Sequence, residues 1–322
     1  MRWPADEVFW LGANLPWLRY GGDFGTNRWQ PEGGVAQPGR RAILRVALER
    51  LAGQGPRAVR WFMLADGRAG LVETPDGRIE GLDDHVFRDA DAALEELERA
   101  GLQVIFVLLD FHWFMPRRVA AGVRLGGRSA VATDADPRRR LIGRVVTPLV
   151  ERYGRHPSIL AWDVVNEPEW VTRRRWGLPR RGVVPRPAMR GLIREVADVI
   201  HGHGSQAATT GSASARSLRL VEGLGLDVYQ VHWYDRVERH APLGRPVASL
   251  GLDRPVILGE FPTRGSLRSP EDIVRTARKA GYAGALAWSA LAGDEASDAG
   301  AMARSLRPGG PAIGNPAPAD VD

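Results

Sequence analysis

Residues 158–168 read SILAWDVVNEP, and this stretch guides the interpretation of the whole chain. An apolar run of strand length ends abruptly in an amide, a carboxylate and a proline. Proline has no backbone N–H to donate to a strand ladder, so the ladder is expected to stop at Pro168. Asn166 and Glu167 are therefore expected at the carboxyl end of a buried strand.

Apolar runs of similar length recur along the chain, and amphipathic segments separate them. Three of these segments, 40–55, 89–101 and 186–204, have a helical pattern and end near glycine, a common helix stop. Strands that alternate with helices predict parallel β-α units, and eight units predict an α/β fold with a single (β/α)8 TIM barrel. The pattern is least regular at the fifth strand and at the sixth helix, which is expected within 242–251. The strands are predicted at 7–15, 57–64, 102–109, 158–165, 206–211, 226–233, 254–260 and 283–290.

The length and composition fit one barrel domain. A chain of 322 residues is long for an ordinary domain but normal for a barrel with insertions. Hydrophobic residues make up 44% of the chain, which is enough for a large core. We expect the barrel to span 1–306 and the Pro/Gly/Ala-rich segment 307–322 to form a loosely ordered tail. The chain has no cysteine, which excludes disulfides and thiolate metal sites.

The net charge of +6 raises the question of a nucleic-acid partner. Lys279 is the only lysine, and the arginines are dispersed along the whole chain. This distribution is typical of the residue usage of a GC-rich genome. The chain also has no RRM-like or helix-turn-helix-like segment, so we expect no nucleic-acid partner.

The N-terminal residues lack a basic start followed by a purely apolar run, so they do not resemble a signal peptide. No segment reaches the roughly 18 uncharged apolar residues that are needed to span a bilayer. We therefore expect no membrane association and a cytoplasmic location, unless an export signal has been removed. The sequence does not indicate an oligomeric state.

A second strand ends in the same way as the first. Residues 256–262 read VILGEFP, so Glu260 follows an apolar run and Pro262 closes it. The carboxyl ends of all strands in a TIM barrel meet at one face, so Glu167 and Glu260 are expected to face each other there. Such a pair suits glycoside hydrolysis, in which one carboxyl protonates the leaving oxygen and the other attacks the sugar or activates water. The alternative is that both glutamates form salt bridges at the barrel rim.

Polar and aromatic residues follow other predicted strands in the same manner. The motifs VRW, DFHWF, NEP, HWY, LGEF and AWSA occur in this order, each at or just after the end of a predicted strand. Together they contain eight candidate site residues: Arg60, His112, Asn166, Glu167, His232, Tyr234, Glu260 and Trp288.

These motifs resemble those of glycoside hydrolase family 5, a cellulase-type family in clan A of retaining (β/α)8 glycosidases. The resemblance covers residues 8 to 290. It implies that Glu167 is the general acid/base, that Glu260 is the nucleophile and that Trp288 is a sugar platform. For Trp288 the alternative is packing in the core.

The remaining motif residues fit supporting roles. Arg60 could keep Glu260 ionised through charge-assisted hydrogen bonds, or it could bridge two loops. Asn166 could donate to the sugar 2-hydroxyl, an interaction that strengthens in the transition state, or it could cap the strand end. Tyr234 could hydrogen-bond Glu260 and stabilise its charge.

Two histidines and several aromatic residues complete the candidate site. His232 could bind sugar hydroxyls or orient Glu167, and His112 could act similarly, although a lone histidine is often a satisfied core residue. Five tryptophans lie at or just past strand ends, and we expect some to form sugar subsites and others to pack in the core. Trp113 and Trp170 are the preferred subsite candidates because each follows a motif directly. The five tryptophans are Trp17, Trp61, Trp113, Trp170 and Trp233.

Two loop features, Asp23 and the basic segment 171–187, each have two interpretations. Asp23, in the loop after the first strand, could bind a sugar hydroxyl at the non-reducing end, or it could stabilise a turn. The basic segment 171–187 could be a lid for an acidic sugar or a solvated loop.

The sequence thus predicts a retaining glycoside hydrolase that works by double displacement, with no metal and no organic cofactor. This mechanism predicts carboxyl groups about 5–5.5 Å apart, whereas an inverting enzyme would hold them about 6.5–9.5 Å apart. The resemblance to family 5 implies a β-linked glucoside or mannoside as the substrate. Without an export signal, we expect a short oligosaccharide or a glycoside. The alternatives are a transglycosylase with the same residues and a carbohydrate-binding protein without activity.

Overall fold

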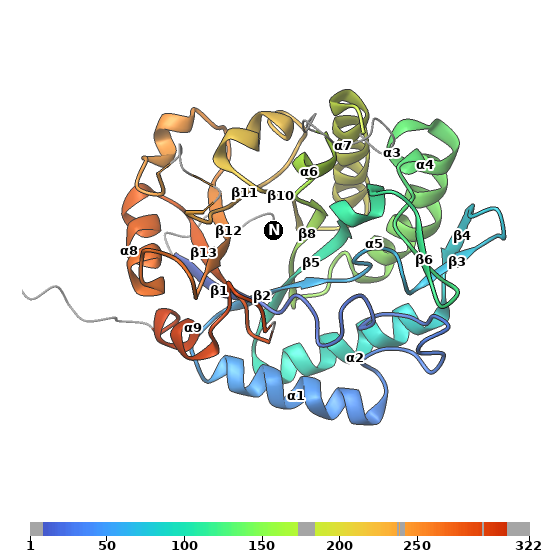
Figure 1. Ribbon diagram of the computed structural model, residues 1–322, viewed down its shortest axis with the longest axis horizontal. Helices are drawn as coiled ribbons and strands as arrows, with labels where there is room; N and C mark the ends of the chain where they lie inside the picture. Colours follow the sequence, from blue (N-terminus) through green and yellow to red (C-terminus); the bar gives the residue numbers. More distant parts are fainter. Residues whose placement is uncertain (1–8, 173–183, 237, 239–241, 292, 308–322) are drawn as a thin grey trace, which may run out of the picture.

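The computed structural model describes residues 9–172, 184–236, 238, 242–291 and 293–307. Its centre is a sheet of nine parallel strands with helices around the outside, seen end-on in Figure 1. The strands are β1 (Trp10–Asn14), β2 (Ala58–Phe62), β5 (Gln103–Asp110), β8 (Ile159–Asn166), β9 (Ala207–Thr209), β10 (Gly211–Ser212), β11 (Tyr229–His232), β12 (Val256–Pro262) and β13 (Gly284–Trp288).

The sheet closes on itself through its fifth strand position. Only Thr210 separates β9 from β10, and the two short strands act as one broken barrel strand. The first half pairs with β8 and the second half pairs with β11, so the ring has eight strand positions. The predicted (β/α)8 barrel is therefore confirmed, and all eight predicted strands are found with ends shifted by a few residues.

The barrel wall is buried on both faces. Strands β8 and β12 have no exposed residue, and β5 has only a partly exposed first residue. A parallel sheet covered by helices requires this, which explains why these strands are nearly continuous apolar runs in the sequence. Each large apolar side chain that is fully buried contributes roughly 1.5–3 kcal/mol to stability.

Helix α2 shows how the outer layer is specified by the sequence. The Asp83 side chain accepts hydrogen bonds from the backbone N–H groups of His85 and Val86, an N-cap worth about 1 kcal/mol. Its buried face, which includes Val86 and Leu94, packs on the barrel. Gly101 ends the helix with a φ of 67°, a left-handed conformation that favours glycine.

The predicted helices at 40–55, 89–101 and 186–204 are confirmed as α1, α2 and α7, with shifted ends. The helix expected within 242–251 is wrong, because the structure has only a 3₁₀ turn at Val247–Leu250 there. Pro242, Gly244, Pro246 and Gly251 interrupt this segment too often for a full helix. The helices are α1 (Pro38–Ala52), α2 (Asp84–Ala100), α3 (Ala130–Thr133), α4 (Ala135–Leu141), α5 (Thr147–Tyr153), α6 (Glu169–Thr172), α7 (Arg186–His203), α8 (Pro270–Ala280) and α9 (Ala299–Ser305).

Two antiparallel hairpins add to the barrel on the side of α4 and α5 (Figure 1). The strands β3 (Leu71–Glu73) and β4 (Ile79–Leu82) follow β2, and β6 (Arg118–Ala120) and β7 (Val123–Leu125) follow β5. Strands of three or four residues are too short to give an alternating pattern, and the sequence did not predict them.

Residues 308–322 of the predicted tail and residues 173–183 of the basic segment lie outside the described residues. Helix α9 packs against α8 and brings the described chain to Arg307. Within the described part of the chain, no helix is both long enough and apolar enough to cross a membrane.

Candidate active site

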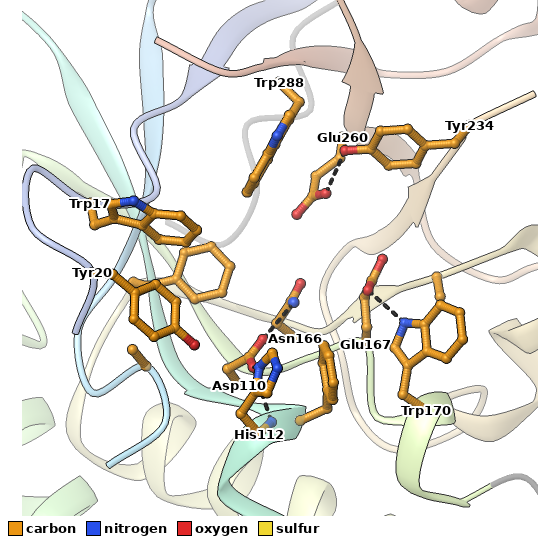
Figure 2. Close-up of a pocket in the computed structure, with 14 residues that line it drawn as sticks. Trp17, Tyr20, Asp110, His112, Asn166, Glu167, Trp170, Tyr234, Glu260 and Trp288 are labelled. Atoms are coloured by element: carbon orange, nitrogen blue, oxygen red, sulfur yellow. Dashed lines mark hydrogen bonds and ion pairs between the residues drawn. The ribbon is translucent and has the colours of Figure 1, made fainter. Parts of the chain in front are cut away.

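A cavity of about 330 Å³ opens at the carboxyl ends of the barrel strands (Figure 2). Four of its lining residues, Phe62, Asp110, Asn166 and Trp288, are the last residues of β2, β5, β8 and β13. The fold therefore determines their position, because parallel strands in a barrel end at one face. The polar lining residues are Asp110, His112, Asn166, Glu167, Tyr234 and Glu260, and the aromatic ones besides Tyr234 are Trp17, Tyr20, Phe62, Phe111, Trp170 and Trp288.

The two predicted carboxylates meet in this cavity. A side-chain oxygen of Glu167 lies within 4.8 Å of a side-chain oxygen of Glu260. This separation fits the roughly 5–5.5 Å of retaining glycosidases better than the roughly 6.5–9.5 Å of inverting enzymes. The bottom of the cavity thus holds two acids close enough to act on one glycosidic bond.

Both side-chain oxygens of Glu260 accept hydrogen bonds. Arg60 donates from Nη1 to Oε1 at 2.7 Å, and the Tyr234 hydroxyl donates to Oε2 at 2.9 Å. Burial raises the pKa of Glu260, and the positive charge of Arg60 and the Tyr234 hydrogen bond oppose this effect. Because Arg60 forms its ion pair with Glu260 and not with Glu167, Glu260 is the carboxyl of the pair that ionises first.

Arg60 is completely buried, and all five of its N–H groups are used. Nε and Nη2 donate to Oδ2 of Asp163 at 3.0 and 2.9 Å. Nη1 also donates to Asn14 at 3.2 Å, and Nη2 also donates to Asn166 at 2.7 Å. The guanidinium therefore fixes Glu260 and Asn166 together, and Asp163 supplies a second negative charge that balances it.

Asp163, which was not among the predicted site residues, links this arginine to the second carboxylate. Its Oδ1 accepts the backbone N–H of Gly211 at 3.1 Å, at the break in the fifth barrel strand. The carbonyl of Gly211 accepts the backbone N–H of Glu167 at 2.7 Å. The available signal was a single charge inside the apolar run LAWDVV, which is costly to bury unless it is paired.

Glu167 has an environment that favours a proton. Burial raises its pKa to about 7, a hydrogen bond from Nε1 of Trp170 (2.7 Å) lowers it, and the charge of Asp110 raises it. A carboxyl with a pKa near the working pH is suited to give a proton and to take it back. The backbone φ of Glu167 is +47°, an uncommon conformation for a residue with a side chain and one that recurs at active sites.

His232 lies beneath the two glutamates and is fully buried. Its Nδ1 is 2.8 Å from Oε1 of Glu167 and 3.6 Å from Oε1 of Glu260. Burial lowers its pKa to about 4, so the imidazole is neutral near pH 7. This position supports the predicted role in orienting Glu167. The other predicted role, binding sugar hydroxyls, is wrong because the side chain has no exposed surface.

Among the described residues, donor atoms of Glu167, His232 and Glu260 are close enough to one another to hold a metal ion. The guanidinium of Arg60, 2.7 Å from Glu260, opposes the binding of a cation at this place. Nδ1 of His232 is also already within hydrogen-bond distance of Glu167. That the reaction needs no metal and no cofactor stays a prediction.

Asn166 and His112 line the floor of the cavity together with Asp110. Asn166 accepts from Arg60 and donates to Oδ2 of Asp110 at 2.8 Å, which leaves one amide N–H for a ligand. Asp110 also accepts the backbone N–H of His112 and contacts its ring Nδ1. Burial lowers the pKa of His112, but the carboxylate of Asp110 outweighs this and raises it overall. Asp110 was missed although, like Asn166, it ends an apolar strand.

Tryptophans lie at opposite sides of the cavity. Trp288 donates from Nε1 to Asp294 at 2.8 Å, which fixes its ring beside the cavity as predicted for a platform. Trp170 contacts Glu167 on the other side, and 36% of its surface is exposed (Figure 2). The predicted positions of Trp288 and Trp170 at the site are thus found in the structure.

Two predicted substrate-binding residues do not reach the cavity. Trp113 has no exposed surface and donates from Nε1 to the carbonyl of Leu64 at 3.2 Å, so it packs beneath the site. Asp23 is only 3% exposed and accepts from the backbone N–H of Leu18 and from Nε1 of Trp61, at 2.7 and 2.8 Å. Both predictions are wrong: Trp113 is a core residue and Asp23 holds a loop together.

The loop after β1 supplies an aromatic wall that was only partly expected. Trp17 and Tyr20 line the cavity, with ring centroids 4.7 Å apart, and Phe62 lies 6.2 Å from Trp17. Of the other two tryptophans at strand ends, Trp61 and Trp233 are both buried. An apolar face of this kind suits the flat, weakly polar faces of a sugar ring.

No family model matches the chain. Two curated relatives do: mannan endo-1,4-beta-mannosidase of Mytilus edulis and the enzyme of the same name from Cryptopygus antarcticus. The first is 24% identical over 328 residues, covering 90% of this chain and 85% of the relative. The second is 23% identical over 340 residues, covering 91% and 83%.

Several solved structures are similar to this chain in fold. The endo-1,4-beta-mannanase of Eisenia fetida has a TM-score of 0.75 at 22% identity, over 93% of this chain and 90% of its own. The beta-mannanase of the blue mussel Mytilus edulis has a TM-score of 0.75 at 19% identity, with the same coverage. A GH5_18 structure from Streptomyces cattleya in complex with Manb1-4GlcNAc has a TM-score of 0.61 at 15% identity, over 88% and 71%. These structures confirm the barrel fold. The two curated relatives are glycosidases by name, in agreement with the predicted resemblance to glycoside hydrolases.

Proposed function

We propose that this protein is a retaining glycoside hydrolase that cleaves β-1,4-mannosidic bonds inside mannan chains or mannooligosaccharides. One observation carries the chemistry: Glu167 and Glu260 lie within 4.8 Å of each other but have different partners. Glu260 faces a guanidinium and a hydroxyl, whereas the pKa of Glu167 is raised to about 7. Glu260 is therefore expected to ionise first, while Glu167 keeps its proton until the pH rises through about 7.

In the first step, the carboxylate of Glu260 attacks the anomeric carbon. The bond from this carbon to the leaving oxygen breaks, and Glu167 gives its proton to that oxygen. The products are a covalent glycosyl-enzyme on Glu260, a shortened sugar with a free hydroxyl, and ionised Glu167.

In the second step, Glu167 takes a proton from water. The hydroxide equivalent adds to the anomeric carbon, and the bond to Glu260 breaks. Two inversions restore the β configuration, and both carboxyls return to their starting state.

The surrounding groups support these steps. Arg60 and Tyr234 stabilise Glu260 as a carboxylate, both before attack and when it leaves. Asn166 lines the cavity, where its second amide N–H can donate to a sugar hydroxyl close to the reacting carbon. Trp288 provides a flat surface beneath that sugar.

The relatives support mannose as the sugar and endo cleavage as the mode of action. Both curated relatives are named as endo-acting on mannan, and each aligns over at least 90% of this chain. Three solved structures with TM-scores of 0.75 or 0.76 are also named as mannanases. Of the two sugars expected from the sequence, these relatives favour the mannoside over the glucoside.

The test is hydrolysis of mannohexaose, with cellohexaose as the matched substrate that differs at the 2-hydroxyl. We expect mannohexaose to be cleaved at internal bonds and cellohexaose to be cleaved far more slowly. Proton NMR of the first product should show the β-anomer. Binding of mannohexaose without turnover would favour a carbohydrate-binding protein, and longer products formed with an added acceptor would favour a transglycosylase.

A further inference from the structure

A row of aromatic rings leads out of the cavity on one side. The ring centroids of Trp288 and Trp17 are 6.1 Å apart, and those of Trp17 and Tyr20 are 4.7 Å apart. The guanidinium of Arg68 lies over the ring of Tyr20 at 4.3 Å and over the ring of Trp29 at 5.6 Å. Trp29 is therefore connected to the cavity through Tyr20 and Arg68.

Trp29 is held rigidly by its backbone while its ring remains exposed. The backbone N–H of Trp29 donates to Oδ1 of Asn27 at 2.7 Å. This bond lies within a tight turn closed by Asn27 and Gln30. The buried side chain of Gln30 anchors this turn by donating to the carbonyls of Gly22 and Gly25, at 2.8 and 3.0 Å. Even so, 43% of the Trp29 surface is exposed, compared with 36% for Trp170.

Arg68 is also fixed in place. It forms a two-point contact with Asp66, from Nε to Oδ1 at 2.9 Å and from Nη2 to Oδ2 at 2.8 Å. Gly21 has a φ of +63°, and a β-carbon there would lie 2.8 Å from Cδ of Arg68. The missing side chain thus makes room for Arg68 against Tyr20, and the guanidinium becomes a rigid spacer between two aromatic rings.

The direction of this row follows from the proposed chemistry. Trp17 and Tyr20 lie across the cavity from Glu167 and Trp170 (Figure 2). Glu167 gives its proton to the leaving oxygen, so the leaving part of the substrate lies near Trp170. Trp17 and Tyr20 consequently face the part of the sugar chain that remains bound to the enzyme in the first step.

We propose that Trp29, supported by Arg68, is a remote sugar-binding platform for this retained part of a mannan chain. The proposal rests on the proposed function. A cavity of about 330 Å³ is at the small end of ligand sites and holds only a few sugar units, so a longer chain must continue over the surface beyond Tyr20. A rigid exposed tryptophan offers such a chain a large contact at little entropic cost.

The experiment compares a long and a short substrate in the intact protein. Trp29→Ala should lower kcat/KM for mannohexaose about 5- to 10-fold, mainly by raising KM, because the contact is made equally in ground and transition states. The kcat/KM for an aryl β-mannobioside should not change, because this substrate is too short to reach Trp29. Trp29→Phe should restore most of the loss. Ile43→Ala, an exposed apolar residue on α1, is the matched control and should change neither value.

The ratio of the two kcat/KM values is independent of the amount of folded enzyme, so partial unfolding of a variant does not obscure the result. An unchanged ratio in Trp29→Ala would overturn the proposal for Trp29 and leave the proposed function intact. An equal loss on both substrates leaves this ratio unchanged and is the same contradicting outcome. Failure of the wild type to cleave either substrate would instead contradict the proposed function.

Discussion

Nδ1 of His232 lies 2.8 Å from Oε1 of Glu167, deep beneath the cavity and out of reach of any ligand. A neutral imidazole in this position holds the acid/base carboxyl in its working orientation without adding a charge. The relationship explains why a histidine ends the sixth barrel strand, β11, even though it cannot touch the substrate.

Replacement of His232 by alanine should therefore affect the chemical step and not substrate binding. We expect kcat to fall roughly 10- to 100-fold, because a misplaced catalytic group costs about this much, while KM stays nearly constant. Steady-state kinetics on mannohexaose measure both values. A raised KM with an unchanged kcat would show that His232 has some other role.

The pKa of Glu167, about 7, predicts the alkaline side of the pH profile. The first step needs Glu167 protonated, so kcat/KM should decline as the pH rises through about 7. Trp170→Phe removes a hydrogen bond that lowers this pKa, and the decline should move to higher pH. The pH dependence of kcat/KM for both proteins checks the direction, and a shift to lower pH would contradict it.

Replacement of Glu167 by alanine should have an effect that depends on the leaving group. Loss of the general acid should slow cleavage of mannohexaose roughly 10²- to 10⁴-fold. An aryl mannoside with a good leaving group needs little protonation, so formation of the glycosyl-enzyme should be much less affected. Added azide needs no general base and should restore turnover by forming a glycosyl azide. An equal loss on both substrates, without rescue by azide, would argue against the acid/base role.

Asp163→Asn should destabilise the protein and impair the site together. Breaking one partner of a buried ion pair costs about 3–5 kcal/mol, and Asp163 and Arg60 both have no exposed side-chain surface. Urea unfolding gives the change in the free energy of unfolding. Asp136→Asn, which removes surface ion pairs with Arg139 and Arg140, is the control and should have little effect. Equal stability of the two variants would contradict the structural role of Asp163.

The sequence predicted the site well where a functional residue lies at or near the carboxyl end of a strand. Asn166 and Glu260 follow or end apolar runs closed by proline, and the barrel fold alone brings such positions to one face. Asp110 also ends an apolar strand, although no proline closes that run, and an inspection of every strand end could have found it. No sequence pattern marks the break between β9 and β10, because it depends on a hydrogen bond from Gly211 to Asp163 on another strand.

Aromatic residues were harder to assign than charged ones. Trp113 and Trp170 each follow a motif directly, but the first turns into the core and the second faces the cavity. Which way a ring points after a strand is decided by the turn that follows and by the neighbouring loops. The wall formed by Trp17 and Tyr20 likewise depends on the path of the long loop after β1.

The most direct measurement is the site of covalent labelling by an activated 2-deoxy-2-fluoro mannoside. The fluorine destabilises the positive charge that develops on the sugar ring, so it slows both steps, and the good leaving group lets the glycosyl-enzyme accumulate. Digestion and mass spectrometry should find the added sugar on the peptide that contains Glu260, and Glu260→Ala should remain unlabelled. A label on another residue, or turnover of the substrate by Glu260→Ala, would contradict the assignment of Glu260 as the nucleophile.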